Sequence, residues 1–324
     1  MAGLFQVFFW LSRDNLVTLN ENSFEKIESL SYSPFEGYDK NLLSSEQIAY
    51  DVNLFENFTN KLRTYGTLEA YKILQSSKDS NLPIDLGLWI GGDLEANNLE
   101  IQRALEILKE YPNRIQSVIV GNEVLLRKEL EPLELYAYID FMKSHTKKPV
   151  TTAETWDIWE KNPQLASHVD FLTIHILPYW EKVPIERYNE FIIEKYSVVE
   201  ELFPNRKIVI GETGWPSHGY NNNSAIPSIK NQAQAIRGFV NLAHEKGWHY
   251  NIIEALDQPW KGYDEGNVGQ YWGIFTTDRA LKFQLAGEVE LNKYWLYQMI
   301  AAIIIGALLT IFGLKNQRVN ISHA

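Results

Sequence analysis

Eight short β-rich runs alternate with amphipathic segments between residues 29 and 276, and this alternation constrains the fold more than any other feature of the chain. Several runs are apolar on both faces, as expected for strands that have helices on one side and a packed interior on the other. A strand followed by a helix, repeated eight times over about 250 residues, predicts an α/β fold in the form of a (β/α)8, or TIM, barrel. The predicted strands are residues 29–33, 61–65, 84–90, 115–120, 149–153, 169–175, 207–210 and 250–255.

The segments between the predicted strands place apolar residues at helical spacing. Ile48, Val52 and Phe55, for example, recur along the segment that opens at Ser44, which is typical of a capped amphipathic helix. A doubly wound open sheet is the alternative fold, but it needs a Gly-rich phosphate loop after its first strand, and residues 33–37 read SPFEG. The predicted helices are residues 44–58, 98–111, 133–143, 185–203 and 230–246.

The composition excludes several classes of function. The chain carries 30 Lys and Arg against 41 Asp and Glu, a net charge of −11, so it lacks the basic face that nucleic-acid binding requires. It has no cysteine, which excludes disulfides, thiol catalysis, iron–sulfur clusters and cysteine-ligated zinc. The seven histidines include no HExxH pair, and we therefore expect no metal site.

The segment 295–314 contains no charged residue and is long enough to cross a bilayer, since a helix of this length spans about 30 Å. Trp295 and Tyr297 stand at one end, and Lys315 and Arg318 follow the other end. This pattern predicts a transmembrane helix with a cytoplasmic tail, and a preceding domain that is periplasmic or extracellular. A buried core helix is the alternative.

The N-terminal sequence is a poor signal peptide, because the apolar run 4–11 has no positive residue before it and no small-residue cleavage site after it. Either the true start lies upstream, or the chain is a fragment, or the C-terminal helix is the targeting element. We expect four parts: an N-terminal segment at 1–28, the barrel at 29–290, the transmembrane helix at 295–314, and a tail at 315–324. If the true start lies upstream, the N-terminal segment is truncated.

Polar and aromatic residues gather where the predicted strands end, and barrel enzymes carry their functional groups at the C-terminal ends of the strands. The aromatic residues could stack on sugar faces or pack the barrel rim. The carboxylates could bind sugar hydroxyls or act as structural salt bridges or caps, and Arg63 could hold a carboxylate rather than touch substrate. The candidate substrate-binding residues are Tyr32, Arg63, Trp89, Asn122, Glu154, Trp156, His175, Tyr179, Trp215, Glu254, Asp257 and Trp260.

Two glutamates are the candidate catalytic residues. Glu123 follows the fourth strand in VIVGNEV, and Glu212 follows the seventh strand in IVIGETGWPS. The ends of these strands face each other across the mouth of a barrel, and a facing pair of carboxylates is what glycosidic cleavage requires. Two solvated loop glutamates are the alternative interpretation.

These two motifs resemble the catalytic signatures of glycoside hydrolase family 17, which comprises β-1,3-glucanases and glucan transglycosylases. Further similar motifs occur in the order expected for that family, so the resemblance covers residues 29–276. The chain looks more like the bacterial branch involved in β-glucan synthesis than like the plant endoglucanases. The further motifs are LRTYG at 62–66, GLWI at 87–90, TTAETWDIW at 151–159, LPYW at 177–180, EALDQPWK at 254–261 and YWGIF at 271–275.

The resemblance implies a retaining mechanism in which Glu123 is the acid/base and Glu212 is the nucleophile. It implies that Asn122 bonds the sugar 2-OH and that Lys261 and Glu265 are supporting charged residues. In that mechanism the pKa of the acid/base is raised while the nucleophile stays ionised. No organic cofactor is needed, because the two carboxylates supply the whole reaction.

The chain departs from the plant pattern after the sixth strand, where a Tyr-Pro-Tyr element is replaced by Leu177, Pro178 and Tyr179, with His175 preceding it. This departure affects the register of the substrate rather than the chemistry. The predicted partners are a β-glucan, the lipid bilayer and a glycosyltransferase. The alternatives to an enzyme are a non-catalytic glucan-binding barrel and a membrane-tethered partner of a glucan synthase.

Overall fold

The structure is a computed structural model that describes residues 16–19, 26–290 and 294–321. The chain divides into two compact units. The larger unit is Glu21–Ala286, and the smaller unit combines Met1–Asn20 with Gly287–Ala324. The apolar run at 4–11, on which the signal-peptide argument rests, lies outside the described residues.

The larger unit is a closed barrel in which the strands follow the order β10-β11-β2-β5-β6-β7-β8-β9, so the predicted fold class is confirmed. Neighbouring strands are parallel throughout the closed sheet, including the closure between β2 and β11. Each of the eight predicted strands overlaps one barrel strand, although β7, β8 and β10 extend two or three residues past the predicted ends and β11 begins one residue earlier. Their bounds are β2 Leu30–Ser31, β5 Leu62–Arg63, β6 Ile84–Leu88, β7 Ile115–Asn122, β8 Val150–Thr155, β9 Leu172–His175, β10 Ile208–Thr213 and β11 His249–Ile252.

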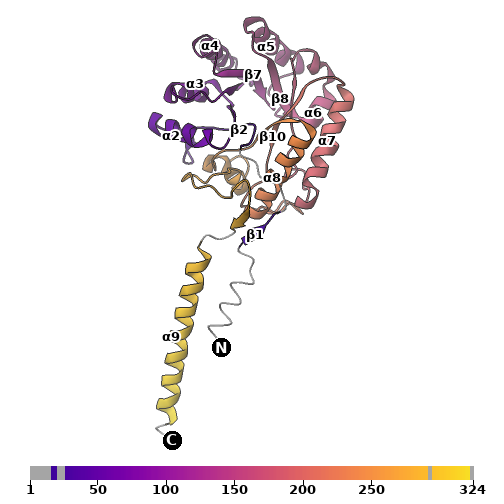
Figure 1. Cartoon of the computed structure of the whole chain (residues 1–324). Coiled ribbons are helices and arrows are strands. Elements are labelled where there is room, and N and C mark those ends of the chain that lie inside the picture. The colour runs from indigo at the N-terminus through magenta and orange to yellow at the C-terminus, as the bar shows by residue number, and fades with distance from the viewer. Residues whose placement is uncertain (1–15, 20–25, 291–293, 322–324) are drawn as a thin grey trace. The chain divides into compact units, whose positions relative to one another are not determined.

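Helices surround the strands (Figure 1). The predicted Ser44 cap is confirmed, since its hydroxyl accepts a hydrogen bond from the amide of Gln47 at 3.2 Å. The sequence analysis missed α3 and α6, which are short. The helices of this unit are α2 Ser45–Glu56, α3 Thr67–Ser76, α4 Leu94–Glu110, α5 Pro132–His145, α6 Trp156–Lys161, α7 Tyr188–Leu202 and α8 Ile229–Lys246.

The expectation that a helix follows every strand is wrong after β11. The chain there forms the short 3-10 helices η3 (Pro259–Gly262) and η4 (Asn267–Tyr271). Pro259, Gly262, Gly266 and Gly269 fall in this stretch, and such residues disfavour a continuous α-helix. Other short elements of this unit are η1 Pro163–Ser167, η2 Ile185–Arg187, and the hairpin of β3 Phe35–Glu36 with β4 Asn41–Leu42.

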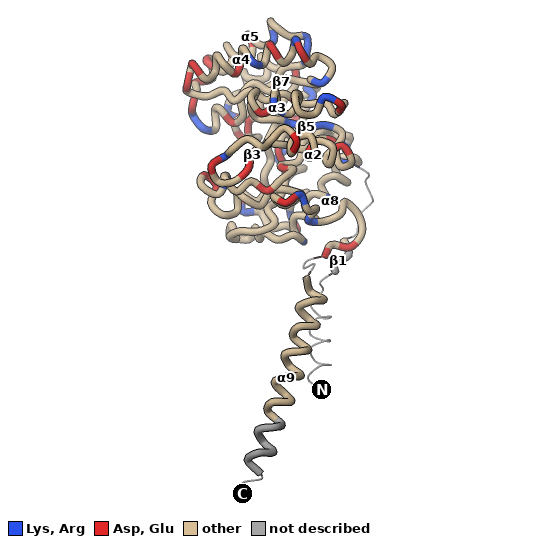
Figure 2. Tube along the Cα trace, turned by 90° about the vertical axis from the view of Figure 1, so that its left-hand side faces the viewer, with Lys and Arg blue, Asp and Glu red and all other residues tan. Residues whose placement is uncertain are grey.

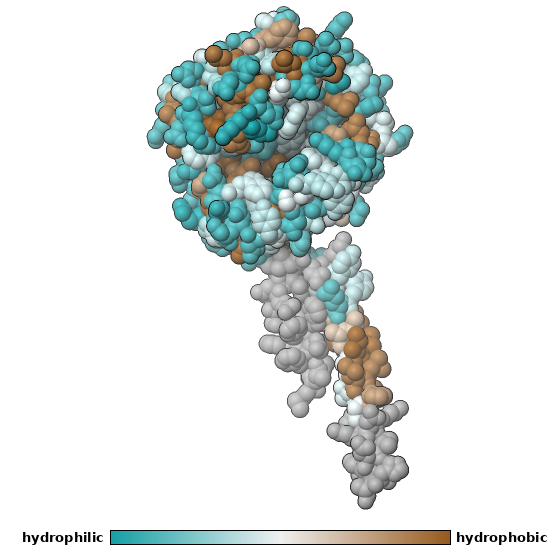
Figure 3. All heavy atoms as spheres, turned by 180° about the vertical axis from the view of Figure 1, so that it is seen from behind, coloured by the Kyte–Doolittle hydropathy of each residue, from teal (hydrophilic) through white to brown (hydrophobic). Residues whose placement is uncertain are grey.

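The smaller unit contains an antiparallel pair and a long helix. Strand β1 (Leu16–Thr18) pairs with β12 (Glu288–Glu290), and α9 runs from Trp295 to Ile321. Among the described residues, one helix is long and apolar enough to cross a membrane. It is Trp295–Gly313, which has a mean hydropathy of 2.1 and none of whose residues are buried against the rest of the protein. Figure 2 shows no charged residue along Trp295–Gly313 of α9, and Figure 3 shows apolar residues there.

Trp159 of α6 packs against the barrel strands and connects the helical layer to them. Its side chain is fully buried, and its Nε1 donates to the carbonyl of Thr173 in β9 at 2.9 Å. The ring also meets Phe203 edge-on, with the centroids 6.3 Å apart. Strand β9 ends in His175, so this contact also supports a residue of the barrel mouth.

We predict that Trp159→Ala lowers the free energy of unfolding by about 3–5 kcal/mol, because a large cavity opens in the core. Trp89→Ala is the matched control, since Trp89 is 46% exposed and its loss changes stability by less than about 1 kcal/mol. Urea unfolding of the full chain in mild detergent measures both values. Equal losses for the two variants would contradict the packing described here.

Candidate active site

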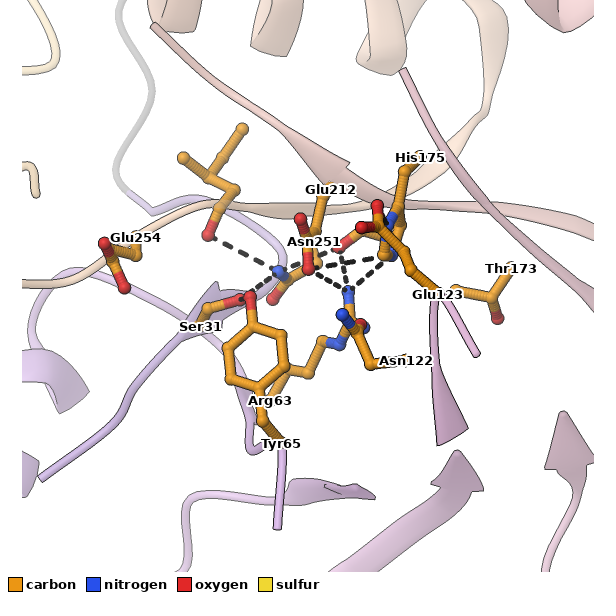
Figure 4. Close-up of polar contacts among 12 residues, drawn as sticks. Ser31, Arg63, Tyr65, Asn122, Glu123, Thr173, His175, Glu212, Asn251 and Glu254 are labelled. Carbon is orange, nitrogen blue, oxygen red and sulfur yellow. Dashed lines mark hydrogen bonds and ion pairs between the residues drawn. The ribbon is translucent and has the colours of Figure 1, made fainter. Parts of the chain in front are cut away.

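The two catalytic candidates meet at the mouth of the barrel. Glu123 follows the last residue of β7, and Glu212 lies in β10. One carboxylate oxygen from each, together with a ring nitrogen of His175, lie within 4.8 Å of one another. Figure 4 shows these side chains converging with that of Arg63. The predicted pairing of the two strand ends is therefore present.

Glycines allow this close approach. Gly121 has a φ of +84°, which a residue with a side chain rarely adopts, and the chain turns there into Glu123. At Gly211 a Cβ would lie 2.4 Å from Thr173 Cγ2 and 3.1 Å from both Arg63 and His175. The backbone before Glu212 thus needs a glycine for Arg63 and His175 to reach it.

Glu212 is 5% exposed and lies beside two nitrogen groups. Its Oε1 is 3.5 Å from Nη1 of Arg63 and 3.6 Å from Nε2 of His175. This oxygen accepts no hydrogen bond from the described residues. A buried carboxylate oxygen that is close to positive charge but carries no hydrogen bond has a lone pair free to attack an electrophile.

The guanidinium of Arg63 joins the strand ends. It is 2% exposed, and it donates to the Gly211 carbonyl at 2.5 Å and to Oδ1 of Asn122 at 2.7 Å. Since Asn122 uses its amide oxygen in this way, its NH2 group remains to donate to another acceptor. Of the two roles considered for Arg63, the geometry favours holding carboxylates over touching substrate.

The pKa of Glu123 differs from the raised value that the resemblance implied. Burial alone raises it, but the hydrogen bond from His175 and the charges of Arg63 and Arg127 outweigh burial and lower the pKa below its ordinary value. The hydrogen bond joins Nδ1 of His175 to Oε1 of Glu123 at 2.7 Å. His175 therefore contacts the acid/base candidate, and its role as a substrate-binding residue stays a prediction.

A cavity of about 310 Å³ opens over the two glutamates. Of the candidate residues, Glu123, Trp156, His175 and Glu212 line it, and Glu265 lines it too. The other lining residues are Leu126, Thr155, Leu177, Trp180, Glu181, Ile253 and Trp272. Trp180 and Trp272 stack, with the centroids 5.8 Å apart. Trp272 was missed as a site residue although it lies in the YWGIF motif, because its contact with Trp180 joins distant segments.

Several aromatic candidates do not reach this cavity. Tyr32, Tyr179 and Trp215 are at most 1% exposed, and the polar atom of each is bonded inside the protein. Their partners are Asp51, the Tyr220 carbonyl and the Ile226 carbonyl. The rim-packing alternative therefore describes these three residues. Trp89 is exposed beneath the guanidinium of Arg127, and Trp260 lies beneath Lys40, both away from the cavity lining.

The remaining charged candidates are bonded within the protein. Glu154 is fully buried and accepts from the amides of Leu125 at 2.7 Å and Leu126 at 3.3 Å, so it fixes the turn after Glu123. Burial raises the pKa of Glu154 to about 7. This is the structural role that had been weighed against substrate binding.

Two ion pairs hold the segment after β11. Lys261 bonds Glu254 at 2.8 Å, and Lys282 bonds Asp257 at 2.6 Å. Burial raises the pKa of Glu254 to about 7 and also raises that of Asp257. Burial alone would lower the pKa of Lys261, but the charge of Glu254 raises it. None of these four groups is among the residues that line the cavity.

Glu123, His175 and Glu212 are close enough to share a metal ion by distance alone. Their surroundings fit a cation poorly, because Nη1 of Arg63 lies 3.2 Å from Nε2 of His175 and 3.5 Å from Glu212. A permanently charged guanidinium thus faces the same ligand atoms that a metal would need.

Comparisons with known proteins are consistent with this geometry. The family model of the BtgE/BtgC glycoside hydrolase domain matches residues 29–273. The chain is 27% identical over 255 residues to a glucan 1,3-β-glucosidase of Schizosaccharomyces pombe, covering 72% of this chain and 79% of that protein. It is 25% identical over 260 residues to a probable family 17 glucosidase of Saccharomyces cerevisiae, covering 78% of this chain and 66% of that protein.

A solved structure is also similar. It is an active-site mutant of a Rhizomucor miehei β-1,3-glucanosyltransferase in complex with laminaritriose. The TM-score is 0.71 at 25% identity, covering 79% of this chain and 95% of that one. The relatives described here are fungal, so the similarity to a bacterial branch stays a prediction.

We predict that the free energy of unfolding falls as the pH rises from 4.5 to 7, in part because of Glu154. In this range the folded chain keeps a proton on Glu154, whose pKa is about 7 against an ordinary 4.5, while the unfolded chain has released it. Each such group lowers the free energy of unfolding by at most about 1.4 kcal/mol per pH unit.

Glu154→Gln removes the ionisation, so urea unfolding at pH 5 and pH 7 should show a smaller loss than in the unaltered chain. Glu190→Gln is the matched control, because the Glu190 side chain is 71% exposed. The same loss in all three proteins would show that Glu154 does not titrate as its burial implies.

Proposed function

The chain belongs to the BtgE/BtgC glycoside hydrolases, which agrees with the resemblance to family 17, and from this membership and the site geometry we propose a retaining enzyme that acts on β-1,3-glucan. It forms a covalent glycosyl-enzyme intermediate and then passes the glucan chain to water or to another sugar. The substrate follows from relatives whose names state activity on 1,3-β-glucan. We propose that Glu123 and Glu212 carry out both chemical steps.

In the first step, an oxygen of Glu212 attacks the anomeric carbon while Glu123 gives its proton to the glycosidic oxygen. The bond between the anomeric carbon and that oxygen breaks, and its electron pair stays on the departing sugar. The oxygen of Glu212 that accepts no hydrogen bond from the described residues suits this attack. In the proposed mechanism, the NH2 group of Asn122 bonds the sugar 2-OH, and this contact strengthens in the transition state.

In the second step, Glu123 takes a proton from water or from a sugar hydroxyl, whose oxygen bonds to the anomeric carbon as the bond to Glu212 breaks. Water gives hydrolysis, and a sugar hydroxyl gives transglycosylation. Trp156 and Trp180 line the cavity and are partly exposed, and aromatic faces suit the flat, hydroxylated faces of sugars. Trp272 is 2% exposed and stacks against Trp180. Lys261 and Glu265 act as supporting charges.

The observation that carries the proposal is the spacing of the two carboxylates. One carboxylate oxygen of Glu123 lies within 4.8 Å of one carboxylate oxygen of Glu212. Retaining enzymes hold their carboxyl groups about 5–5.5 Å apart, whereas inverting enzymes leave about 6.5–9.5 Å for a water molecule. The short spacing supports direct attack by Glu212.

The proposal includes a membrane anchor. Residues 29–290 form the glycoside hydrolase domain, 295–314 cross the bilayer, and 315–324 form the cytoplasmic tail. The uncharged helix Trp295–Gly313 supports this division. The hydrolase domain then works in the periplasm or outside the cell, where it remodels glucan emerging from a glycosyltransferase.

The proposed activity can be tested with linear β-1,3-gluco-oligosaccharides and the full chain in mild detergent. We expect shorter products from hydrolysis or longer products from transfer, read by mass spectrometry. Glu212→Gln should lower the rate at least about a thousandfold, because the nucleophile is lost. Proton NMR of the first-formed products should show the β-anomer. An α-product would contradict a retaining mechanism, and unchanged oligosaccharides would favour a glucan-binding barrel.

The anchor can be tested by fractionation. The full chain should stay with membranes after alkaline carbonate washing. The double change Ile304→Lys and Leu308→Lys should release it, because each lysine at the centre of a span costs about 2.5–3.5 kcal/mol. Leu133→Lys is the control, since Leu133 is 79% exposed on α5. Retention of the double variant would contradict a spanning role for α9.

A further inference from the structure

His175 lies between the two catalytic candidates with its side chain fully buried. Its Nδ1 is 2.7 Å from Oε1 of Glu123. Its Nε2 is 3.2 Å from Nη1 of Arg63 and 3.6 Å from Oε1 of Glu212. Figure 4 shows the ring between these groups. A buried imidazole with both nitrogens engaged is held in one orientation.

The neighbours of the ring decide where its proton lies. The guanidinium of Arg63 has no acceptor, so the contact at 3.2 Å requires Nε2 of His175 to accept. In the neutral ring the proton is then on Nδ1, which donates to the carboxylate of Glu123. Arg63 of β5 thereby selects the tautomer that serves the residue following β7.

Other charged groups face the ring from the remaining strands. Glu212 approaches the ring from β10, and Glu154 of β8 is close enough to interact with it electrostatically. Glu123, Glu154, Glu212 and Arg63 thus surround it. Of these, Glu123 is the one that accepts a hydrogen bond from the ring in the described structure.

The bond from His175 distinguishes the two oxygens of Glu123. Oε1 is held at 2.7 Å, while the side chain of Glu123 remains 22% exposed and lines the cavity. Oε2 is therefore the oxygen that remains for a proton. A fixed carboxyl group whose reacting oxygen is singled out loses less freedom on reaching the transition state.

We propose that His175 is a positioning residue that acts through Glu123: its Nδ1–H holds Oε1, so that Oε2 gives the proton to the leaving oxygen and takes one back in the second step. This inference rests on the proposed function, because it needs Glu123 to be the acid/base. When Oε2 releases its proton, the new carboxylate keeps the hydrogen bond from Nδ1 and the nearby charge of Arg63. No further proton or electron is needed, because the leaving oxygen takes the proton and His175 keeps its own.

The same bond fixes the expected effect of pH. It favours the ionised form of Glu123, in agreement with the lowered pKa of that group. Loss of the protonated acid sets the alkaline limb of kcat/KM. Removing the donor should therefore move the alkaline limb to higher pH and slow the protonation step.

Two variants of the full chain separate the roles of His175. His175→Phe keeps a planar ring but has no donor. His175→Asn places an amide N–H near the position of Nδ1 but cannot become charged. With β-1,3-gluco-oligosaccharides, we expect His175→Phe to lose about a hundredfold in kcat/KM, the lower range for acid/base assistance. Its alkaline limb should shift to higher pH, and His175→Asn should recover activity to within about tenfold of the unaltered chain.

A substrate with a leaving group that departs without protonation, dinitrophenyl β-laminaribioside, provides the second readout. The burst of dinitrophenolate reports attack by Glu212 and bypasses the acid. We expect the burst rate of His175→Phe to equal that of the unaltered chain. An equal loss on both substrates would overturn the proposal, because His175 would then serve Glu212 or the fold. An unmoved alkaline limb would also overturn it.

The tautomer can be tested without turnover. Long-range nitrogen–proton NMR of the unaltered chain, with the His175 signal assigned by its absence in His175→Asn, should show the proton on Nδ1. A proton on Nε2 would overturn the proposal even if His175→Phe fails to fold. If the unaltered chain releases no dinitrophenolate and converts no oligosaccharide, the proposed function fails and this inference fails with it.

Discussion

The buried guanidinium of Arg63 is the interaction on which the site depends. It comes from β5 and reaches Asn122 at the end of β7, His175 of β9 and the Gly211–Glu212 peptide of β10. A buried charge is costly unless it is paired and hydrogen-bonded. Its partners here are the groups from which the active site is built. The cost of burying Arg63 therefore restricts four strand ends to one arrangement, and the side chains of the site are fixed before any ligand arrives.

The carboxylates around this centre fall into two groups. Glu123 and Glu212 line the cavity, whereas Glu154 and Glu254 do not line it and have amide and lysine partners of their own. Burial raises the pKa of Glu154 and Glu254, whereas the pKa of Glu123 is lowered, because the hydrogen bond from His175 and the charge of Arg63 outweigh its burial. Carboxyl groups of one residue type thus acquire different protonation behaviour from their neighbours alone.

Much of this arrangement could be predicted from the sequence, because strand periodicity and the position of residues at strand ends are local properties. Each of the eight barrel strands overlaps a predicted run, and Glu123, Glu212 and His175 meet where the barrel rule places them. The aromatic residues were harder to place. Tyr179 and Trp215 sit at strand ends as Trp156 does, but their side chains are buried in the rim, and Trp272 lines the cavity from a segment that follows no strand directly. Which way a side chain points depends on packing between distant segments.

The sequence by itself determined the class of fold, the two glutamates and the uncharged helix near the C-terminus, because each is a pattern along the chain that one strand, one turn or one helix displays alone. Only the tertiary structure decided the contacts of His175 with Glu123 and Arg63, the lowered pKa of Glu123 and the role of Glu154 as a support for the following turn. These properties depend on distances between groups on different strands, and a distance of a few ångströms decides whether a charge stabilises its neighbour or leaves it unaffected. Closure of the barrel brings the groups within that range, and closure is a property of the whole sheet.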